Sequence, residues 1–433
     1  MRALILGLSV YFFGANVRLL NQLFEWKGDV MSGINVKSEI QQLKKVLLHR
    51  PGKELLNLTP DTLEELLFDD IPFLKVAQDE HDEFAQVLRD NGVEVVYLED
   101  LMAETLKGNP DLKKQFLEQF IAEAGVSEKR LVEACYELLD AIECEKELVL
   151  KTMEGVNVDE LDLDESNLLS ALTQEESRLV INPMPNLYFT RDPFASIGNG
   201  VSINHMYSVT RNRETIYAEY IFKYHPDYKD VPQYYDRYAD VHIEGGDILN
   251  INDHVLAIGI SQRTQAAAID KIAEKIFDAE SSSIDTILAF DIPNNRAMMH
   301  LDTVFTQIDV DKFTIHPGIM GTLTVFELKK VDGVVEVSKI EDTLENVLGK
   351  YLECEVKLIP CGAGNRIAAE REQWNDGSNT LCIAPGTVVV YDRNDVTNEV
   401  LRDHGITVLE ISSAELSRGR GGPRCMSMPL VRG

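Results

Sequence analysis

Five short segments of the sequence carry side chains that could do chemistry. They supply a thiol, imidazole rings, carboxylates and guanidinium groups, which nucleophilic and acid–base catalysis use. In chain order the segments are PNLYFTRDP from Pro185, HIEGGD from His242, MHLDT from Met299, CGAGNR from Cys361 and SRGRGGPRCM from Ser417.

Cys425 has the most informative surroundings of any cysteine in the chain. It follows a glycine- and arginine-rich run, 418–424, in a strongly acidic protein. Neighbouring cations favour the thiolate, which is the nucleophilic form of cysteine. The sequence thus predicts a flexible basic loop that activates Cys425, and a packing role is the alternative.

The other cysteines have the pattern of packing residues. The chain has 6 cysteines and no C-x-x-C pair. This is too sparse for a disulfide scaffold, and the spacing fits no zinc module. We therefore expect free thiols and a cytoplasmic location.

Two segments place a histidine two residues before a carboxylate. Residues i and i+2 of a strand point to the same face, so a strand would pair His300 with Asp302, and likewise His242 with Glu244. The adjacent Gly245 would leave room for a ligand to approach the backbone. The alternative is an ordinary hydrogen-bonded pair at a sheet edge.

A metal site and a dinucleotide site compete with this interpretation. H-x-D with a distant His316 or His404 has the composition of a non-haem iron triad, but it leaves Cys425 and the arginines without a role. CGAGNR resembles half of a dinucleotide fingerprint, yet Ile367 stands at the third small position. We expect no metal and no cofactor, and a glycine turn at Cys361.

The elements that position these residues alternate between strands and helices. A strand at 42–49, a helix at 84–90 and a strand at 93–98 form one strand–helix–strand unit. Apolar residues at helical spacing predict an all-helical insertion at 103–177. The polar segments from Asp192 onward recur at about fifty to sixty residues, which favours a repeat architecture over a doubly wound sheet.

Composition excludes some classes of partner. The chain has 433 residues, 44% of them hydrophobic, with 42 Lys and Arg against 72 Asp and Glu, a net charge of −30. A protein this acidic repels phosphate backbones and anionic membranes. We expect neither nucleic acid nor membrane as a partner.

The first thirty residues form a separate N-terminal extension. The apolar run Ala3–Phe13 is shorter than the roughly 20 residues of a membrane-spanning helix, and no clear signal-peptide cleavage site follows it. Codons for the KGDV that precedes Met31 can contain a purine-rich ribosome-binding stretch. We therefore predict that translation naturally starts at Met31.

In this order the segments resemble the arginine deiminase family of guanidine-modifying enzymes. The resemblance runs from about Met31 to Val431 and includes HRPG at His49, ISQRT at Ile260 and WNDGSN at Trp374. It implies a five-bladed α/β propeller of ββαβ modules in residues 31–102 and 178–433, with the helical insertion in the first module. Pro423-Arg424 and the end at Gly433 depart from the family pattern.

The resemblance also implies roles for individual residues. Cys425 would be the nucleophile, His300 the general acid and base, and Glu244 the partner that orients His300. Asp192 and Asp302 would hold the guanidinium group. The residues that would bind the rest of the substrate are Asn186, Phe189, Arg211, Asp247, Arg263 and Arg420.

The implied reaction is hydrolysis of free L-arginine to L-citrulline and ammonia through a covalent thiouronium on Cys425. It would run in a dimer or larger homo-oligomer. Arginines in the site fit the α-carboxylate of the free amino acid, which agmatine lacks. The alternatives are an amidinotransferase, an agmatine deiminase, a propeller that only binds ligands, and a metal-dependent oxygenase.

Overall fold

One pattern of strand pairing recurs through the chain. The computed structural model describes residues 33–162, 179–293 and 298–433. Within them, five units each contain an antiparallel strand pair, followed by a parallel strand that a helix connects to it. The fold is therefore mixed α/β. The single doubly wound sheet is wrong, because the described strands fall into separate sheets.

The first unit contains β1 (Leu43–Leu48), α2 (Leu74–Asp90), β2 (Glu94–Tyr97) and β19 (Met428–Arg432), and the second contains β5 (Phe194–Ile197), β6 (Gly200–Ile203), α8 (Val209–Asn212), α9 (Ile216–Tyr224) and β7 (Gln233–Tyr235). The third unit contains β8 (Ile248–Asn250), β9 (Val255–Ile260), α10 (Ala266–Asp278) and β10 (Thr286–Asp291), and the fourth contains α11 (Leu301–Val304), β11 (Phe305–Gln307), β12 (Lys312–Ile315), α12 (Leu344–Leu352) and β15 (Lys357–Pro360). The fifth unit contains α13 (Arg366–Trp374), β16 (Leu381–Ala384), β17 (Thr387–Tyr391), α14 (Asp395–Asp403) and β18 (Thr407–Ile411).

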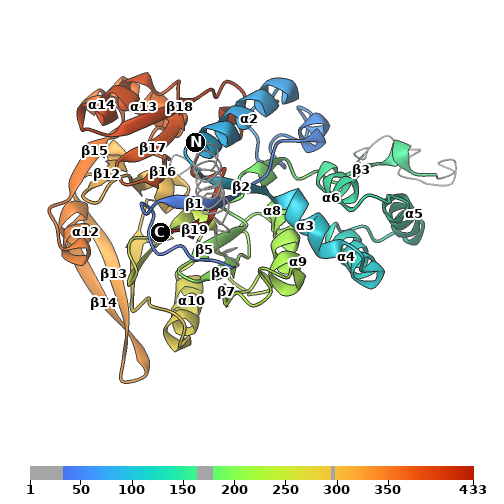
Figure 1. Cartoon of the computed structure of the whole chain (residues 1–433), viewed down its shortest axis with the longest axis horizontal. Coiled ribbons are helices and arrows are strands. Elements are labelled where there is room, and N and C mark those ends of the chain that lie inside the picture. Colours follow the sequence, from blue (N-terminus) through green and yellow to red (C-terminus); the bar gives the residue numbers. More distant parts are fainter. Residues whose placement is uncertain (1–32, 163–178, 294–297) are drawn as a thin grey trace, which may run out of the picture. The chain divides into compact units, whose positions relative to one another are not determined.

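The last strand completes the first unit. β19 pairs antiparallel with β1, and Met428 lies opposite Leu47. β19 is buried throughout, and β1 is buried except at Lys44 and Lys45. β1 and β19 lie side by side in Figure 1. Cys425 precedes β19 by three residues in sequence, so this pairing constrains the position of its backbone.

A long hairpin widens the sheet of the third unit. β13 (Thr322–Val331) and β14 (Val334–Thr343) lie between β12 and α12 in sequence, and β13 pairs with β10. The resulting five-stranded sheet has the order β14-β13-β10-β9-β8. The hairpin extends away from the other strands in Figure 1.

A group of helices follows β2. These are α3 (Leu98–Leu106), α4 (Pro110–Glu123), α5 (Lys129–Asp140) and α6 (Glu145–Glu154). The Asn109 side chain caps α4, and Gly155 ends α6 with a φ of 85°. The expectation of a purely helical segment is wrong at β3 (Val156–Asn157), a short strand that pairs with β4 (Leu179–Ile181).

These helices pack against α9 through aromatic side chains. Phe116 is fully buried, and its ring meets that of Tyr220 edge to face at 5.3 Å. Tyr217 lies 6.2 Å from the same ring. Buried apolar area of this kind supplies most of the stability of an amphipathic helix group.

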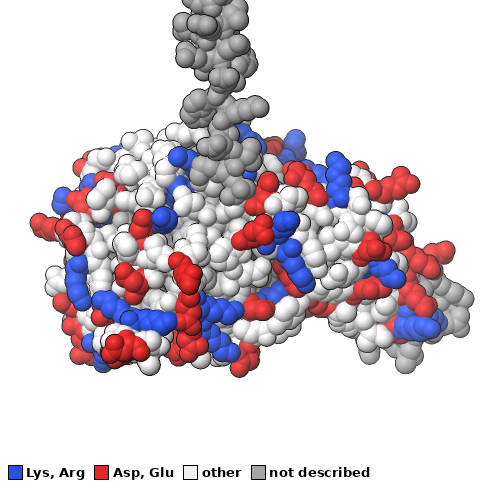
Figure 2. Space-filling model, turned by 60° about the horizontal axis from the view of Figure 1, so that its bottom comes forward, with Lys and Arg blue, Asp and Glu red and all other residues white. Residues whose placement is uncertain are grey.

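The surface and the helix lengths bear on possible partners. Figure 2 shows Lys and Arg side chains interspersed with Asp and Glu across one face. In the parts of the chain that the structure describes, no helix combines the length and the apolar composition needed to span a bilayer. The predictions about the extension 1–30 and the start at Met31 lie outside the described residues.

We predict that Phe116→Ala destabilises the protein by about 3–5 kcal/mol, because it leaves a cavity between α4 and α9. Urea unfolding followed by circular dichroism measures the change in the free energy of unfolding. Lys114→Ala on the same helix, where the side chain is 62% exposed, is the control and should cost less than about 0.5 kcal/mol. Equal losses for the two variants would contradict this packing role.

Candidate active site

Cys425 lies in a pocket of loop residues from several units. Its backbone N–H donates to Oδ1 of Asn379 at 3.2 Å, and its carbonyl accepts from the N–H of Arg191 at 3.1 Å. Its Sγ lies 3.7 Å from Oδ2 of Asp302, and the residue is 5% exposed. The thiol is therefore held from both sides and is almost fully shielded from water.

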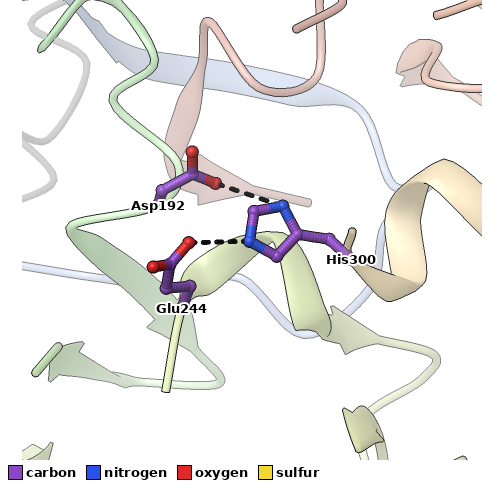
Figure 3. A group of neighbouring side chains, drawn as sticks. All are labelled: Asp192, Glu244 and His300. Atoms are coloured by element: carbon purple, nitrogen blue, oxygen red, sulfur yellow. Dashed lines mark hydrogen bonds and ion pairs between the residues drawn. The ribbon is translucent and has the colours of Figure 1, made fainter. Parts of the chain in front are cut away.

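His300 lies between two carboxylates (Figure 3). Its Nε2 is 2.8 Å from Oε2 of Glu244, and its Nδ1 is 3.9 Å from Oδ1 of Asp192. The expected strand through His300 and Asp302 is wrong, because α11 begins at Leu301. Asp302 lies in the first turn of that helix, which turns its side chain toward Cys425 instead.

The expected pairing of His242 with Glu244 is also wrong. His242 contacts the carbonyl of Arg263 through Nδ1 at 2.8 Å, whereas Glu244 bonds to His300. The two glycines after Glu244 allow other parts of the chain, and not a ligand, to approach their backbone closely. A Cβ on Gly245 would lie 1.9 Å from the Arg191 carbonyl oxygen, and a Cβ on Gly246 would lie 2.5 Å from Nδ1 of His300.

The electrostatics of this group favour a charged ion pair. Burial lowers the pKa of His300, but Asp192, Glu244 and Asp247 outweigh burial and raise it to about 9. Burial opposes ionisation of Glu244 as well, yet Arg263 and His300 lower its pKa to about 2. At neutral pH His300 is therefore an imidazolium with a proton to give.

Asp247 supports His300 from behind. Its carboxylate accepts from the backbone N–H of Leu301 at 2.8 Å and from the hydroxyls of Ser261 and Thr264, each at 2.6 Å. It is fully buried and does not line the cavity beside Cys425. Its contacts fix the backbone that carries the imidazole.

Asp192 and Asp302 each have one oxygen that accepts a hydrogen bond from an arginine and one that accepts none from the described residues. Oδ2 of Asp192 accepts from Arg211 at 2.8 Å, and Oδ2 of Asp302 accepts from Arg424 at 2.7 Å. Both Oδ1 atoms are buried and have no hydrogen-bond partner among the described residues. Buried unpaired carboxylate oxygens are costly, so the pair is suited to bind a cationic N–H donor.

The surroundings of Cys425 do not favour its thiolate, contrary to the prediction from the basic loop. Burial is the largest cause that raises the pKa of this thiol well above its ordinary range. Asp302, Asp192 and Asp376 raise it further, whereas Arg424 lowers it. The thiol is therefore the stable form at neutral pH until a cation neutralises these carboxylates.

The basic loop is also tied down. Arg418 pairs with Asp70 and with Glu415, and Arg420 pairs with Asp69 at 3.2 Å. The Arg420 guanidinium lies 3.5 Å from the ring centre of Trp374. Thus acidic residues before α2 neutralise most of the charge that the sequence placed near Cys425.

A cavity of about 570 Å³ opens beside the thiol, a size typical of small-molecule sites. Three of the predicted site residues do not line this cavity: Glu244, Asp247 and Asp302. Of the residues singled out in the sequence, those that line it are Asn186, Phe189, Asp192, Arg211, Arg263, His300, Arg420 and Cys425.

Several lining residues escaped the sequence analysis. Tyr207 and Met299 line the cavity, and residues between Pro60 and Asp69 cover it from the first unit. No local sequence pattern marks the segment 60–69 as part of the site, because it lines the cavity only through its position opposite the loop 418–424. The one available indication that this segment belongs to the site was charge: Asp69 and Asp70 are acidic, and the run 418–424 is basic.

The group of Asp192, Glu244 and His300 has the donor set of a metal site. Its ligand atoms all lie within 4.8 Å of one another. A metal requires a neutral imidazole, whereas this imidazole is protonated and bonded to Glu244. His316 and His404, the candidates for a third ligand, bond instead to their own neighbours, Gly318 and Val400.

CGAGNR forms a tight turn between β15 and α13, as expected of a glycine turn. Gly362 has a φ of 73°, and a Cβ there would lie 2.2 Å from the backbone nitrogen of Ala369. The Asn365 side chain then caps α13. The turn brings α13 close to β15.

We predict that Cys425 reacts with iodoacetamide at least about tenfold more slowly than the exposed Cys144 at pH 7. Its rate should still increase as the pH rises above 9, because deprotonation occurs only near the raised pKa. Peptide mass spectrometry measures both rates. Asp302→Asn removes a carboxylate that stabilises the thiol, so it should accelerate the reaction of Cys425 at pH 7; an unchanged or slower rate would contradict this electrostatic account.

Known proteins resemble this chain over most of its length. A family model described as arginine deiminase matches residues 64–432. The chain is 63% identical to the arginine deiminase of Treponema denticola, over 93% of this chain and 99% of that protein. It is 56% identical to the arginine deiminase of Clostridium perfringens, over 92% and 98% of the two chains.

A solved structure shares the fold. The amidinotransferase SxtG from Microseira wollei superimposes with a TM-score of 0.52 at 14% identity, over 92% of this chain and 97% of that one. At this identity the likeness concerns the fold alone. Since the family model and the relatives cover most of the sequence at high identity, the chain belongs to the arginine deiminase family.

Proposed function

We propose that this protein hydrolyses free L-arginine to L-citrulline and ammonia, with Cys425 as the nucleophile and without a metal or organic cofactor. One observation carries the proposal. A buried thiol lies beside two aspartates, Asp192 and Asp302, that each leave one oxygen without a hydrogen-bond partner among the described residues. Family membership supports the same activity.

The carboxylate pair suits a guanidinium group. This group is planar and cationic, and a carboxylate can accept two of its N–H bonds in a fork. Asp192 borders the cavity, while Asp302 lies behind Cys425. Sγ contacts Oδ2 of Asp302, so binding would require Sγ to turn toward the substrate carbon and the Asp302 carboxylate to become accessible to the guanidinium.

Substrate binding would also create the nucleophile. The carboxylates that keep Cys425 protonated are those that the substrate cation would neutralise. Once they are neutralised, the thiol can release its proton to solvent water, because His300 already carries one, and the thiolate can attack the central guanidinium carbon. The thiol stays unreactive in the empty site, which protects it from oxidation and other electrophiles.

His300 then moves the protons. As the C–N bond of the tetrahedral adduct breaks, the imidazolium protonates the departing nitrogen, so ammonia leaves and a thiouronium stays on Cys425. The neutral imidazole next takes a proton from water, whose oxygen attacks the same carbon. The C–S bond then breaks while the adduct loses its hydroxyl proton to solvent, which restores the thiolate and leaves a ureido group on the product. Glu244 stabilises the imidazolium throughout.

Three arginines would recognise the other end of the substrate. Arg211, Arg263 and Arg420 line the cavity, as do Asn186 and Phe189. A cationic cluster binds the α-carboxylate of free arginine and gives agmatine no counterpart. Asp247, which does not line the cavity, would act by holding the backbone next to His300 and not by touching the substrate.

We further propose that the five strand units are blades of a propeller, formed by residues 31–102 and 178–433. The pairing of β19 with β1, which joins the first and last of the described strands in one unit, supports this arrangement. Residues 103–177 would then be an insertion in the first blade. A cytoplasmic location and a dimer or larger homo-oligomer remain part of this proposal.

We predict that purified protein converts L-arginine to equal amounts of citrulline and ammonia, and that excess EDTA leaves the rate unchanged. Cys425→Ser should lower kcat by at least about 1,000-fold, because it removes the nucleophile, while Cys144→Ser should not. Colorimetric citrulline and enzymatic ammonia assays measure both products. Loss of activity in EDTA would favour a metal site at Asp192, Glu244 and His300, and amidino transfer to an added amine without ammonia would indicate an amidinotransferase.

We predict that Arg263→Ala lowers kcat/KM for L-arginine at least about tenfold more than any residual kcat/KM for agmatine, because agmatine lacks the carboxylate that Arg263 would bind. Steady-state ammonia release with each substrate gives the two ratios. Arg263 also lies 3.6 Å from Glu244, and loss of that contact would affect both substrates alike. Equal losses would therefore disprove the carboxylate clamp.

A further inference from the structure

A buried ion pair lies directly behind Asp302. Arg424 is 1% exposed, and its three nitrogens contact three different groups. Nε donates to Oε2 of Glu39 at 3.2 Å, Nη1 donates to Oδ2 of Asp302 at 2.7 Å, and Nη2 donates to the carbonyl of Ile248 at 2.9 Å. The guanidinium plane is thus fixed at every corner.

Glu39 is fixed just as firmly. It is 3% exposed, its Oε1 accepts from the N–H of Asn250 at 3.0 Å, and its own N–H donates to the Asn250 carbonyl at 2.7 Å. Asn250 is the last residue of β8, so a strand end of the third unit holds Glu39 in place. A rigid path therefore runs from β8 through Glu39 and Arg424 to Asp302.

We propose that Glu39 and Arg424 are positioning residues for the reaction: they hold one oxygen of Asp302 so that the other faces the substrate guanidinium. This inference rests on the proposed function, and it assigns a role to Arg424, where the sequence departs from the family pattern. Neither residue touches the substrate. Each acts through the rotation of the Asp302 carboxylate.

The local charges show why both members are needed. Three buried arginines, Arg191, Arg424 and Arg432, surround Glu39, and the burial that opposes its ionisation is overcome so that its pKa falls to about 2. Arg191 and Arg432 make hydrogen bonds to backbone carbonyls, whereas Arg424 reaches both carboxylates. Without Glu39, the Arg424 guanidinium would lose the bond that sets its plane.

A purely structural ion pair is the alternative. Glu39 belongs to the segment before β1, and its bond to Arg424 could serve only to anchor that segment to the loop before β19. If that were its only role, substitutions of Glu39 would change the stability of the protein but not the orientation of the Asp302 carboxylate. The test must therefore report the orientation of the carboxylate separately from folding and from thiol reactivity.

Two alkylating probes separate these effects. Chloroacetamidine is an amidinium whose binding needs the aspartate pair, and Cys425 displaces its chloride to form a thioether. Iodoacetamide is neutral and reports the thiolate alone, so the ratio of the two rate constants cancels changes in thiol pKa or access. We expect this ratio to fall about tenfold in Glu39→Gln and about 100-fold in Arg424→Met, with partial rescue in Arg424→Lys.

Arg432→Met is the matched control. Arg432 is also 1% exposed and lies beside Glu39, but its side chain bonds to the carbonyls of Gln41 and Cys382. The ratio of the chloroacetamidine and iodoacetamide rate constants should stay within about twofold of the wild-type value in this variant, even if the variant is less stable. If Arg424→Met does not fold, Glu39→Gln and Glu39→Asp carry the test.

Ratios near wild type in folded Glu39 and Arg424 variants, or an equal fall in Arg432→Met, would overturn the proposal. Citrulline formation by the wild-type protein is measured in parallel. Its absence would refute the proposed function and not the positioning role, because the alkylation ratio can be determined without turnover.

Discussion

The site depends on an excess of buried negative charge around one thiol. Asp192 and Asp302 lie near Cys425, and each has one oxygen bonded to an arginine and one without a hydrogen-bond partner among the described residues. Ionised groups away from water are unfavourable unless they are paired. The empty site is therefore an incomplete ion-pair network, and a planar cation completes it. Burial, together with Asp302 and Asp192, raises the pKa of the thiol, and Asp192 also contributes with Glu244 and Asp247 to the raised pKa of His300.

The fold supplies these groups from distant parts of the chain. They come from loops or short helices next to strands of four units, with His300 and Asp302 in the same unit, and none of them lies within a strand. The pairing of β19 with β1 sets the backbone of Cys425, while α11 directs Asp302 and leaves His300 in the extended residue before it. Glycines at 245 and 246 let two such segments touch at distances that a side chain would prevent.

The segments that carry the chemistry were predictable from the sequence, because reactive side chains and glycines have local patterns. Cys425, His300, Glu244 and Asp192 were singled out in this way, and so was the helix around 84–90. The geometry that joins them was not. A two-residue spacing predicted a strand at His300 and at His242, whereas His300 precedes a helical turn and Glu244 bonds to His300 across 56 residues of sequence.

The sequence by itself therefore determined the mixed α/β class, the family and most of the reactive groups, since these follow from residue types and their order. Tertiary structure alone decided their charge states and partners. The arginines before Cys425 suggested an activated thiolate, but Asp69 and Asp70 neutralise two of them and burial beside carboxylates reverses the effect. Likewise nothing near Glu39 in sequence indicates Asp302. Electrostatic effects depend on distance and burial in space, and local sequence fixes neither.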